Sequence, residues 1–407
     1  MTGEVAGLVL RDNTFQTQAL SVTGRIAPQM LDAHERFIQF LEKSGRLNRA
    51  IEFLPSDEEI AERRAAGEGL TSPERAVLLA YSKIWTYDEL LASTLPDDPW
   101  VGTALTRYFP QRLHERYAQY MLRHPLRREI IATHVVNSMV NRVGSTFIHR
   151  LMETTGARSH EIVRAYLLTR EVFDFVGAWQ AIESLDNKVA DAVQSGMLID
   201  LGRLMYRGTT WFLRSRVLAD DIGSTIQHFA PRIATLASRI PDLLDSGERA
   251  RRDERAARYM SDAVPSDIAA RVVNLDALYA TLDIVAIADA RSRPLETVAD
   301  VYFALSAKLD VPWLRERIAG LPGDAHWQVL AKGAMLDDLY ALQRTITAEV
   351  LGTAADIAAP NALIAAWQDH NQRGIARAAQ LITELRSVPA VDAAMIAVAL
   401  RELRNLA

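Results

Sequence analysis

Residues 71–84 read TSPERAVLLAYSKI, and this stretch carries the signals that decide the fold class. Thr71 and Glu74 have the spacing of a capping box, in which each side chain bonds the other residue's backbone N–H, and Pro73 suits a first helical turn. The stretch SDEEIAER, residues 56–63, repeats this order with Ser56 and Glu59. In both places an apolar run follows, so we predict that a helix begins at each box.

Helical spacing continues on both sides of these boxes. Between Pro28 and Gly45, apolar residues recur at steps of three and four, as one face of a helix requires. A long helix is expected from about Leu126 through Val140, and Ser159 is expected to cap the next one. Strand signals are weak, because no Asn-Gly or Asp-Gly turn separates alternating runs. We therefore predict an all-α fold, a large multi-helix array or bundle without a Rossmann sheet.

The division of the chain follows from changes in composition. The last 54 residues, from Ala354, contain 16 alanines, which predicts a tightly packed terminal pair of helices. The run 248–258 is densely charged, with acids four residues before arginines, which is typical of a solvated helix or helical linker. We expect a boundary at this charged run, between a helical region at 55–246 and a C-terminal helical region at 247–407; a leading segment at 1–54 precedes them.

Composition excludes several classes of protein. The chain has 407 residues, no cysteine and a net charge of −5, so disulfide scaffolds, thiolate metal sites and a strongly basic nucleic-acid binder are excluded. No apolar stretch approaches about 18 residues, the length of a transmembrane helix. The N-terminus lacks a basic start followed by an apolar run, as a secretory signal would have. We expect a soluble, cytoplasmic protein without membrane or nucleic-acid partners.

The familiar motifs of nucleotide and metal chemistry are missing from the sequence. Gly67 and Gly69 lie two apart in a polar stretch between two expected helices, without the third glycine or the preceding strand of a dinucleotide site. His34-Glu35 and His114-Glu115 each lack the second histidine that a zinc-binding helix needs. The residues therefore give little support to a stand-alone nucleotide-dependent enzyme, and we predict no cofactor-binding or metal-ligating residue in this chain.

One expected helix carries a polar stripe. Thr133, Asn137 and Asn141 recur at steps of four, and His134 neighbours Asn137 on the helix surface. These four residues could bind a polar ligand. The interpretation we favour is a buried helix whose polar groups bond neighbouring helices, because buried polar groups need partners.

Arginines and aromatic residues alternate just before that helix. The arginines are Arg107, Arg112, Arg116, Arg123, Arg127 and Arg128, and the aromatic residues are Tyr108, Phe109, Tyr117 and Tyr120. Such a stretch suits an interface with another domain, since the planar arginine fork is favoured there. Solvated arginines paired with nearby carboxylates, or a nucleic-acid site, are the other interpretations. We name Arg107, Arg112, Arg116, Arg127 and Arg128 as interface candidates.

The order of several motifs resembles one known family. They include RDN at 11–13, NRAIEFLPSDEEIAER at 48–63, GLTSPERAVLLAYSKI at 69–84, LPDDP at 95–99, LRREIIAT at 126–133, VNR at 140–142 and ETTGA at 153–157. This chain resembles the C-terminal region of the large bacterial NAD-specific glutamate dehydrogenases, most closely over residues 1 to about 215.

The resemblance implies a role within a longer enzyme of amino-acid catabolism. The family oxidises L-glutamate to 2-oxoglutarate and ammonia with NAD, and its catalytic and NAD-binding residues lie upstream, with no matching position here. NAD would therefore belong to the parent enzyme, and this region would support the catalytic domain of the same polypeptide and contribute to a homo-oligomer. Met1 is expected to begin an excised fragment, or to be an internal methionine used as a start. The alternative is a stand-alone helical regulator that binds a small anion through Arg127 and Arg128.

Overall fold

The computed structural model describes residues 2–323, 326–353 and 359–406, with the side chains of Thr2, Arg107 and Arg216 left aside. The described residues form α-helices and short 3-10 helices without a strand, so the predicted all-α fold is confirmed. The chain divides into two compact units, Met1–Gln227 and His228–Ala407. The boundary falls inside one helix, α13 (Ile222–Leu243). The three-part division of the sequence stays a prediction.

Unit 1 begins with α1 (Thr2–Arg25) and ends inside α13. Between them lie, in chain order, α2 (Leu31–Lys43), α3 (Asp57–Ala66), α4 (Ser72–Leu91), η1 (Leu95–Asp97), α5 (Pro99–Gly102), α6 (Ala104–Tyr108), η2 (Gln111–Leu113), α7 (His114–Leu122), α8 (Arg127–Val143), α9 (Phe147–Thr155), α10 (Ser159–Val172), α11 (Phe175–Glu183), α12 (Asp191–Arg214) and η3 (Arg216–Ala219). Helix α10 lies inside the unit, because most of its residues are buried. Gly208 of α12 lets the two helices approach closely, since a Cβ atom there would lie 2.6 Å from Thr169 of α10.

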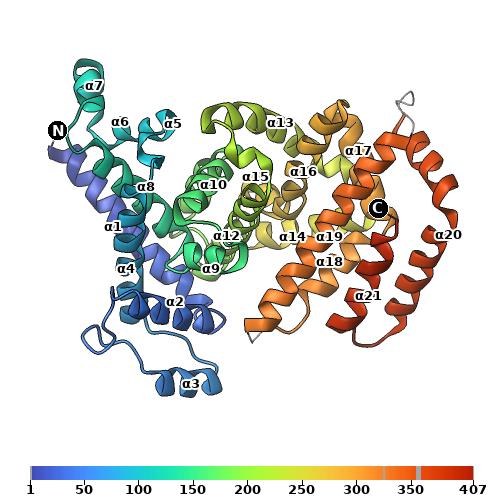
Figure 1. The fold of residues 1–407 in the computed structure, drawn as a ribbon, viewed down its shortest axis with the longest axis horizontal. Helices are drawn as coiled ribbons and strands as arrows, with labels where there is room; N and C mark the ends of the chain where they lie inside the picture. Colours follow the sequence, from blue (N-terminus) through green and yellow to red (C-terminus); the bar gives the residue numbers. More distant parts are fainter. Residues whose placement is uncertain (1, 324–325, 354–358, 407) are drawn as a thin grey trace. The chain divides into compact units, whose positions relative to one another are not determined.

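The first helix lies along the outside of unit 1. Figure 1 shows α1 running beside α4 and α8, and both helices contact it. The start of α1 and α7 lie at one end of the unit, whereas α3 and the loop that precedes it lie at the other. A helix of 24 residues is about 36 Å long, so the two ends of unit 1 are well separated.

Unit 2 contains the remaining helices. They are α14 (Ser246–Ser261), α15 (Ser266–Val273), α16 (Leu275–Arg291), α17 (Leu295–Lys308), α18 (Val311–Ala319), α19 (His326–Thr353), α20 (Pro360–Ser387) and α21 (Ala393–Arg404), after the second part of α13. Its core lies between α16, α17 and α19, and α16 is buried on nearly all sides.

The alanine-rich end forms the predicted helix pair. Arg377 of α20 donates a hydrogen bond of 2.7 Å to Glu402 of α21, and Gly374 lies so close to the turn after α21 that a Cβ atom there would be 2.7 Å from Leu406. Residues 354–358 of this segment lie outside the described residues.

The helix boundaries also test the predicted caps. Ser56 and Glu59 bond each other's backbone N–H groups, and Glu74 bonds the N–H of Thr71, as the capping boxes predict. The long helix expected over 126–140 is α8. The predicted cap at Ser159 is wrong by one residue: Arg158 is the N-cap of α10, and Glu161 bonds its N–H. Ser159 is instead buried, and its hydroxyl is directed towards Glu89.

Candidate interdomain interface

One arginine fixes the first helix to the rest of unit 1. The guanidinium of Arg142 on α8 lies over the rings of Phe15 and Trp179, 4.1 and 4.8 Å from their centroids. It also pairs with the carboxylate of Glu183 on α11 and donates a hydrogen bond of 3.1 Å to Gln18. The Arg142 side chain is only 10% exposed, so these contacts are shielded from water. They hold α1 against α8 and α11. The orientation of α1 is thus set by unit 1 itself.

The start of α1 leaves apolar side chains uncovered. Val5, Val9 and Leu10 are exposed in its first three turns. Glu4 accepts a hydrogen bond of 2.6 Å from the backbone N–H of Gln111. This bond ties the start of α1 to η2, which leads into α7. The uncovered part of α1 and the arginine-rich stretch therefore lie next to each other.

The structure divides the predicted arginine candidates into two groups. Arg112 and Arg116 are exposed, and no ion pair among the described residues includes either of them. Arg116 lies over the ring of Tyr117, and Tyr120 beside it is 64% exposed. We call Arg112, Arg116, Tyr117, Tyr120 and Arg123 the arginine–tyrosine surface. Tyrosine and arginine are enriched in protein interfaces, so this surface has the composition of a contact site.

The other candidates have structural partners. Arg127 and Arg128 both pair with Asp97. Arg128 also donates to the carbonyl oxygens of Leu91 and Ser93, at 2.9 and 2.8 Å, and so caps the C-terminal end of α4. The side chain of Arg107 lies outside the described residues, although its backbone belongs to α6.

The polar stripe of α8 is spread over different environments. Thr133 is exposed and donates to the carbonyl oxygen of Glu129 in its own helix. His134 and Asn137 are half-buried, and Asn141 is buried with its side-chain oxygen left without a described hydrogen-bond partner. None of the four lines the pocket beside Arg232 and Asp289 or the pocket beside Asn48 and Arg49. A ligand role for this stripe stays a prediction.

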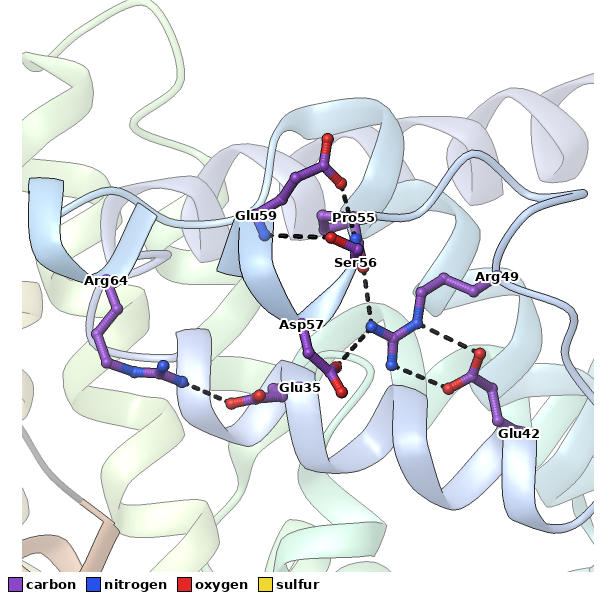
Figure 2. Close-up of polar contacts among 8 residues, drawn as sticks. All are labelled: Glu35, Glu42, Arg49, Pro55, Ser56, Asp57, Glu59 and Arg64. Carbon is purple, nitrogen blue, oxygen red and sulfur yellow. Dashed lines mark hydrogen bonds and ion pairs between the residues drawn. The ribbon is translucent and has the colours of Figure 1, made fainter. Parts of the chain in front are cut away.

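The loop between α2 and α3 is a feature that the sequence patterns did not reveal. Figure 2 shows Arg49 at its centre, between the carboxylates of Glu42 and Asp57. Arg49 donates to Glu42 at 2.9 Å, to Asp57 at 2.7 Å and to the carbonyl oxygen of Pro55 at 3.0 Å. The hydrogen bond from Arg49 lowers the pKa of the Asp57 carboxyl below its usual value. This loop borders an open pocket of about 490 Å³.

Two large apolar side chains of that loop face solvent. Ile51 is 69% exposed and Phe53 is 88% exposed. Phe53 has a φ of +53°, a left-handed conformation that residues with a Cβ atom seldom adopt. The segment lacks helical or strand periodicity. Although residues 48–63 are among the motifs of the resemblance, no pattern in them predicted that Ile51 and Phe53 would face solvent.

Unit 2 contains a buried polar cluster that sequence patterns also missed. Asp283 of α16 is fully buried and accepts a hydrogen bond of 2.9 Å from Arg344 of α19. Burial raises the pKa of the Tyr302 phenol well above its ordinary value, and the charge of Asp283 adds to this effect. On the same principle, burial raises the pKa of Glu248, whose carboxylate lies 3.4 Å from Arg315.

The helical fold and a sequence comparison together identify the family of this chain. The described residues form helices without a strand, which defines an all-helical protein, and exposed apolar and tyrosine side chains lie at both ends of unit 1. Residues 67–405 match the family "Glutamate dehydrogenase, C-terminal", and the chain belongs to this family.

Three longer proteins are similar along the whole chain. It is 39% identical over 407 residues to the NAD-specific glutamate dehydrogenase of Pseudomonas aeruginosa and 38% identical over 407 residues to that of Halomonas elongata. It is 34% identical over 406 residues to that of Mycobacterium tuberculosis. In each comparison all of this chain is matched, but only 25% of the relative. The chain therefore spans about a quarter of the length of these relatives.

The relatives' cofactor can be tested against this structure. Gly67 and Gly69 lie in the loop between α3 and α4, and no strand precedes them. A Cβ atom at Gly69 would lie 2.3 Å from the backbone of Ala27, so this glycine serves close packing. These residues do not form the phosphate-binding turn of a dinucleotide site.

The described residues also bear on the membrane and metal expectations. No helix among them is long and apolar enough to cross a bilayer. Likewise, residues 2–323, 326–353 and 359–406 contain no group of three His, Asp or Glu side chains that could hold a metal ion.

Proposed function

We propose that this chain is the non-catalytic, helical C-terminal part of an NAD-specific glutamate dehydrogenase. The parent enzyme would convert L-glutamate, NAD and water to 2-oxoglutarate, ammonium and NADH. The observation that carries this proposal is the full-length match of the chain to a quarter of each relative, together with the family's description.

The catalytic part of the same polypeptide is the partner we propose, and the start of α1 with the arginine–tyrosine surface is its docking site. Three features support this choice. The surface lies beside the start of the chain, through the bond between Glu4 and Gln111. Arg142 holds α1 rigidly, so a domain preceding α1 would meet unit 1 in a defined orientation. The uncovered tyrosines and arginines offer both apolar area and charge-assisted hydrogen bonds.

A role in oligomer contacts of the parent, in the cytoplasm, completes this proposal. The relatives' great length supports a multidomain enzyme, and closed homo-oligomers are common among such proteins. Gel filtration of the native enzyme with light scattering measures this directly.

The size of the native polypeptide tests the central claim. An antibody raised against this chain, used on a lysate of the source cells, should detect a band about four times heavier than 45.3 kDa. A band at 45.3 kDa would overturn the proposal. The purified 407-residue chain, mixed with glutamate and NAD, should produce no NADH above the rate of a protein-free control. NADH formation by this chain would contradict its non-catalytic role.

A second experiment tests the docking site. In the long polypeptide, Tyr120→p-benzoylphenylalanine should cross-link on irradiation to peptides outside residues 1–407. The matched control is the same substitution at Tyr259 of α14, on the highly charged helix, where little cross-linking is expected. Equal cross-linking at both positions would count against the arginine–tyrosine surface.

The stand-alone regulator is less well supported. It requires Arg127 and Arg128 to be available for an anion, but both pair with Asp97 and Arg128 also caps α4.

A further inference from the structure

The loop of residues 48–55 is held in place by contacts with three helices. Arg49 joins it to Glu42 of α2 and to Asp57 of α3 (Figure 2). Glu52 accepts a hydrogen bond of 2.7 Å from the hydroxyl of Tyr81 on α4. Asn48 accepts hydrogen bonds from the backbone N–H groups of Ala50 and Ile51 within the loop. The backbone of the loop therefore has a defined shape in the absence of any partner.

The same loop directs its apolar side chains outward. Ile51 and Phe53 are exposed although Leu54 and Pro55, directly after them, are buried. The Phe53 side chain is almost fully exposed, so packing against the rest of the fold does not offset the strain of its left-handed backbone. The hydrogen bonds on both sides of Phe53 nevertheless hold that backbone conformation. Strained residues held in this way are typical of recognition sites, where the shape is prepared before contact.

The arginines around the loop are all paired, so the charge that remains for a partner is acidic. Residues 46–64 contain five carboxylates and four arginines, and Arg46, Arg49, Arg63 and Arg64 each form an ion pair with a carboxylate. Glu58 and Glu62 are exposed on α3. A partner for this surface must offer an apolar pocket for Phe53 with lysine or arginine side chains around it.

We infer that the loop of residues 48–55 docks, through Ile51 and Phe53, into a basic-rimmed apolar pocket in the part of the parent polypeptide that lies outside this chain. The inference rests on the proposed function, because it requires that longer polypeptide. This loop would be a second contact site, at the end of unit 1 opposite the arginine–tyrosine surface. The rest of the parent enzyme would then contact unit 1 at both ends.

The area available favours a contact within one polypeptide. Ile51 and Phe53 together expose on the order of 300 Å² of side chain. A stable complex of separate chains buries about 800 Å² on each partner. A contact this small is sufficient where covalent connection already holds the partners together, because the effective concentration is then in the millimolar range. About three-quarters of each relative lies outside the matched region and can supply the pocket.

Photo-cross-linking of the long polypeptide tests the inference. Phe53→p-benzoylphenylalanine keeps an aromatic side chain at the same position, so the fold should persist, and unchanged gel-filtration volume and circular dichroism would verify this. On irradiation, we expect cross-links from residue 53 to peptides outside residues 1–407 of the same molecule. The double charge reversal Glu58→Lys with Glu62→Lys should reduce the cross-linked fraction at least fivefold, because the rim of the pocket is basic.

Each other outcome has a definite meaning. Cross-linking no greater than in the irradiated unsubstituted protein overturns the inference. Cross-links between differently isotope-labelled copies show that a second molecule occupies the loop, which also overturns it. A native polypeptide of only 45.3 kDa would overturn the proposed function itself, whereas a long polypeptide that shows no cross-link from residue 53 would overturn the docking of this loop alone.

Discussion

The guanidinium of Arg142 lies 4.1 Å from the centroid of the Phe15 ring, which joins two residues 127 positions apart. Since Phe15 belongs to α1 and Arg142 to α8, this contact fixes the orientation of the first helix relative to the rest of unit 1. The same guanidinium contacts Trp179 and pairs with Glu183. One side chain thus links α1, α8 and α11.

We predict that Arg142→Ala lowers the free energy of unfolding of unit 1 by about 2–4 kcal/mol, because it leaves the Glu183 carboxylate partly buried without its arginine. Urea denaturation monitored by circular dichroism measures this change. Arg142→Lys should recover less than half of the loss, since lysine lacks the planar group that stacks on both rings. The matched control is Arg203→Ala at an exposed arginine, where we expect a change within about 0.5 kcal/mol. Equal losses in Arg142→Ala and Arg203→Ala would show that the contacts of Arg142 do not stabilise α1.

The backbone of Phe53 provides a second prediction. Because φ is +53° at this exposed residue, Phe53→Gly should relieve a left-handed conformation and raise the free energy of unfolding by about 1 kcal/mol relative to Phe53→Ala. Phe53→Ala is the matched control, since it removes the same aromatic ring but keeps a Cβ atom. Thermal unfolding of the 407-residue chain compares the two variants. Equal midpoints would mean that the loop relaxes without strain.

The buried histidine of α2 gives the chain a pH dependence. Burial, followed by the charges of Arg75 and Arg150, lowers the pKa of His34 to about 4 from an unfolded value near 6.5. The unfolded chain therefore binds the proton more readily between pH 6.5 and 4, so stability decreases as the pH falls through this range. The loss from this one group amounts to about 3 kcal/mol at pH 4 and is absent above pH 7.

Urea titrations at several pH values test this dependence. His34→Gln should flatten the slope of the unfolding free energy between pH 6.5 and 4, whatever its effect on stability at pH 7. His149, whose pKa burial also lowers, should leave part of the slope in place. An unchanged slope in His34→Gln would contradict the assignment.

The sequence predicts those parts of the fold that are determined by residues close together in the chain. The boxes at Ser56–Glu59 and Thr71–Glu74 act within four residues, and the periodicity of 126–140 reports a single helix. At the start of α10 the capping preference of serine did not predict the cap, because Ser159 is buried inside the unit and Arg158 is the N-cap. Local patterns thus give the helices, while packing shifts their ends.

The proposed contact surfaces could be predicted from the sequence only in part. The density of arginine and tyrosine between residues 107 and 128 singled out a segment with exposed arginines and tyrosines, but it could not show that Arg128 caps α4 while Arg116 remains exposed. That difference depends on Asp97 and Leu91, which lie some 30 residues earlier. The loop around Phe53 was missed because its strained backbone and its contact with Tyr81 have no periodic signature.

The pair Asp283–Arg344 of unit 2 supports a last prediction, in which the two partners respond unequally. The Asp283 side chain is 1% exposed, whereas that of Arg344 is 42% exposed. Arg344→Met leaves a buried carboxylate without its arginine, so unit 2 should lose about 3 kcal/mol of unfolding free energy. Asp283→Asn should cost less than about half of that, because the asparagine is neutral and Arg344 can turn towards water. The charge of Asp283 contributes to the raised pKa of Tyr302, so spectroscopic titration of the tyrosines should also show an earlier transition in Asp283→Asn. A larger loss in Asp283→Asn than in Arg344→Met would show that Arg344, and not Asp283, is the group that the fold must neutralise.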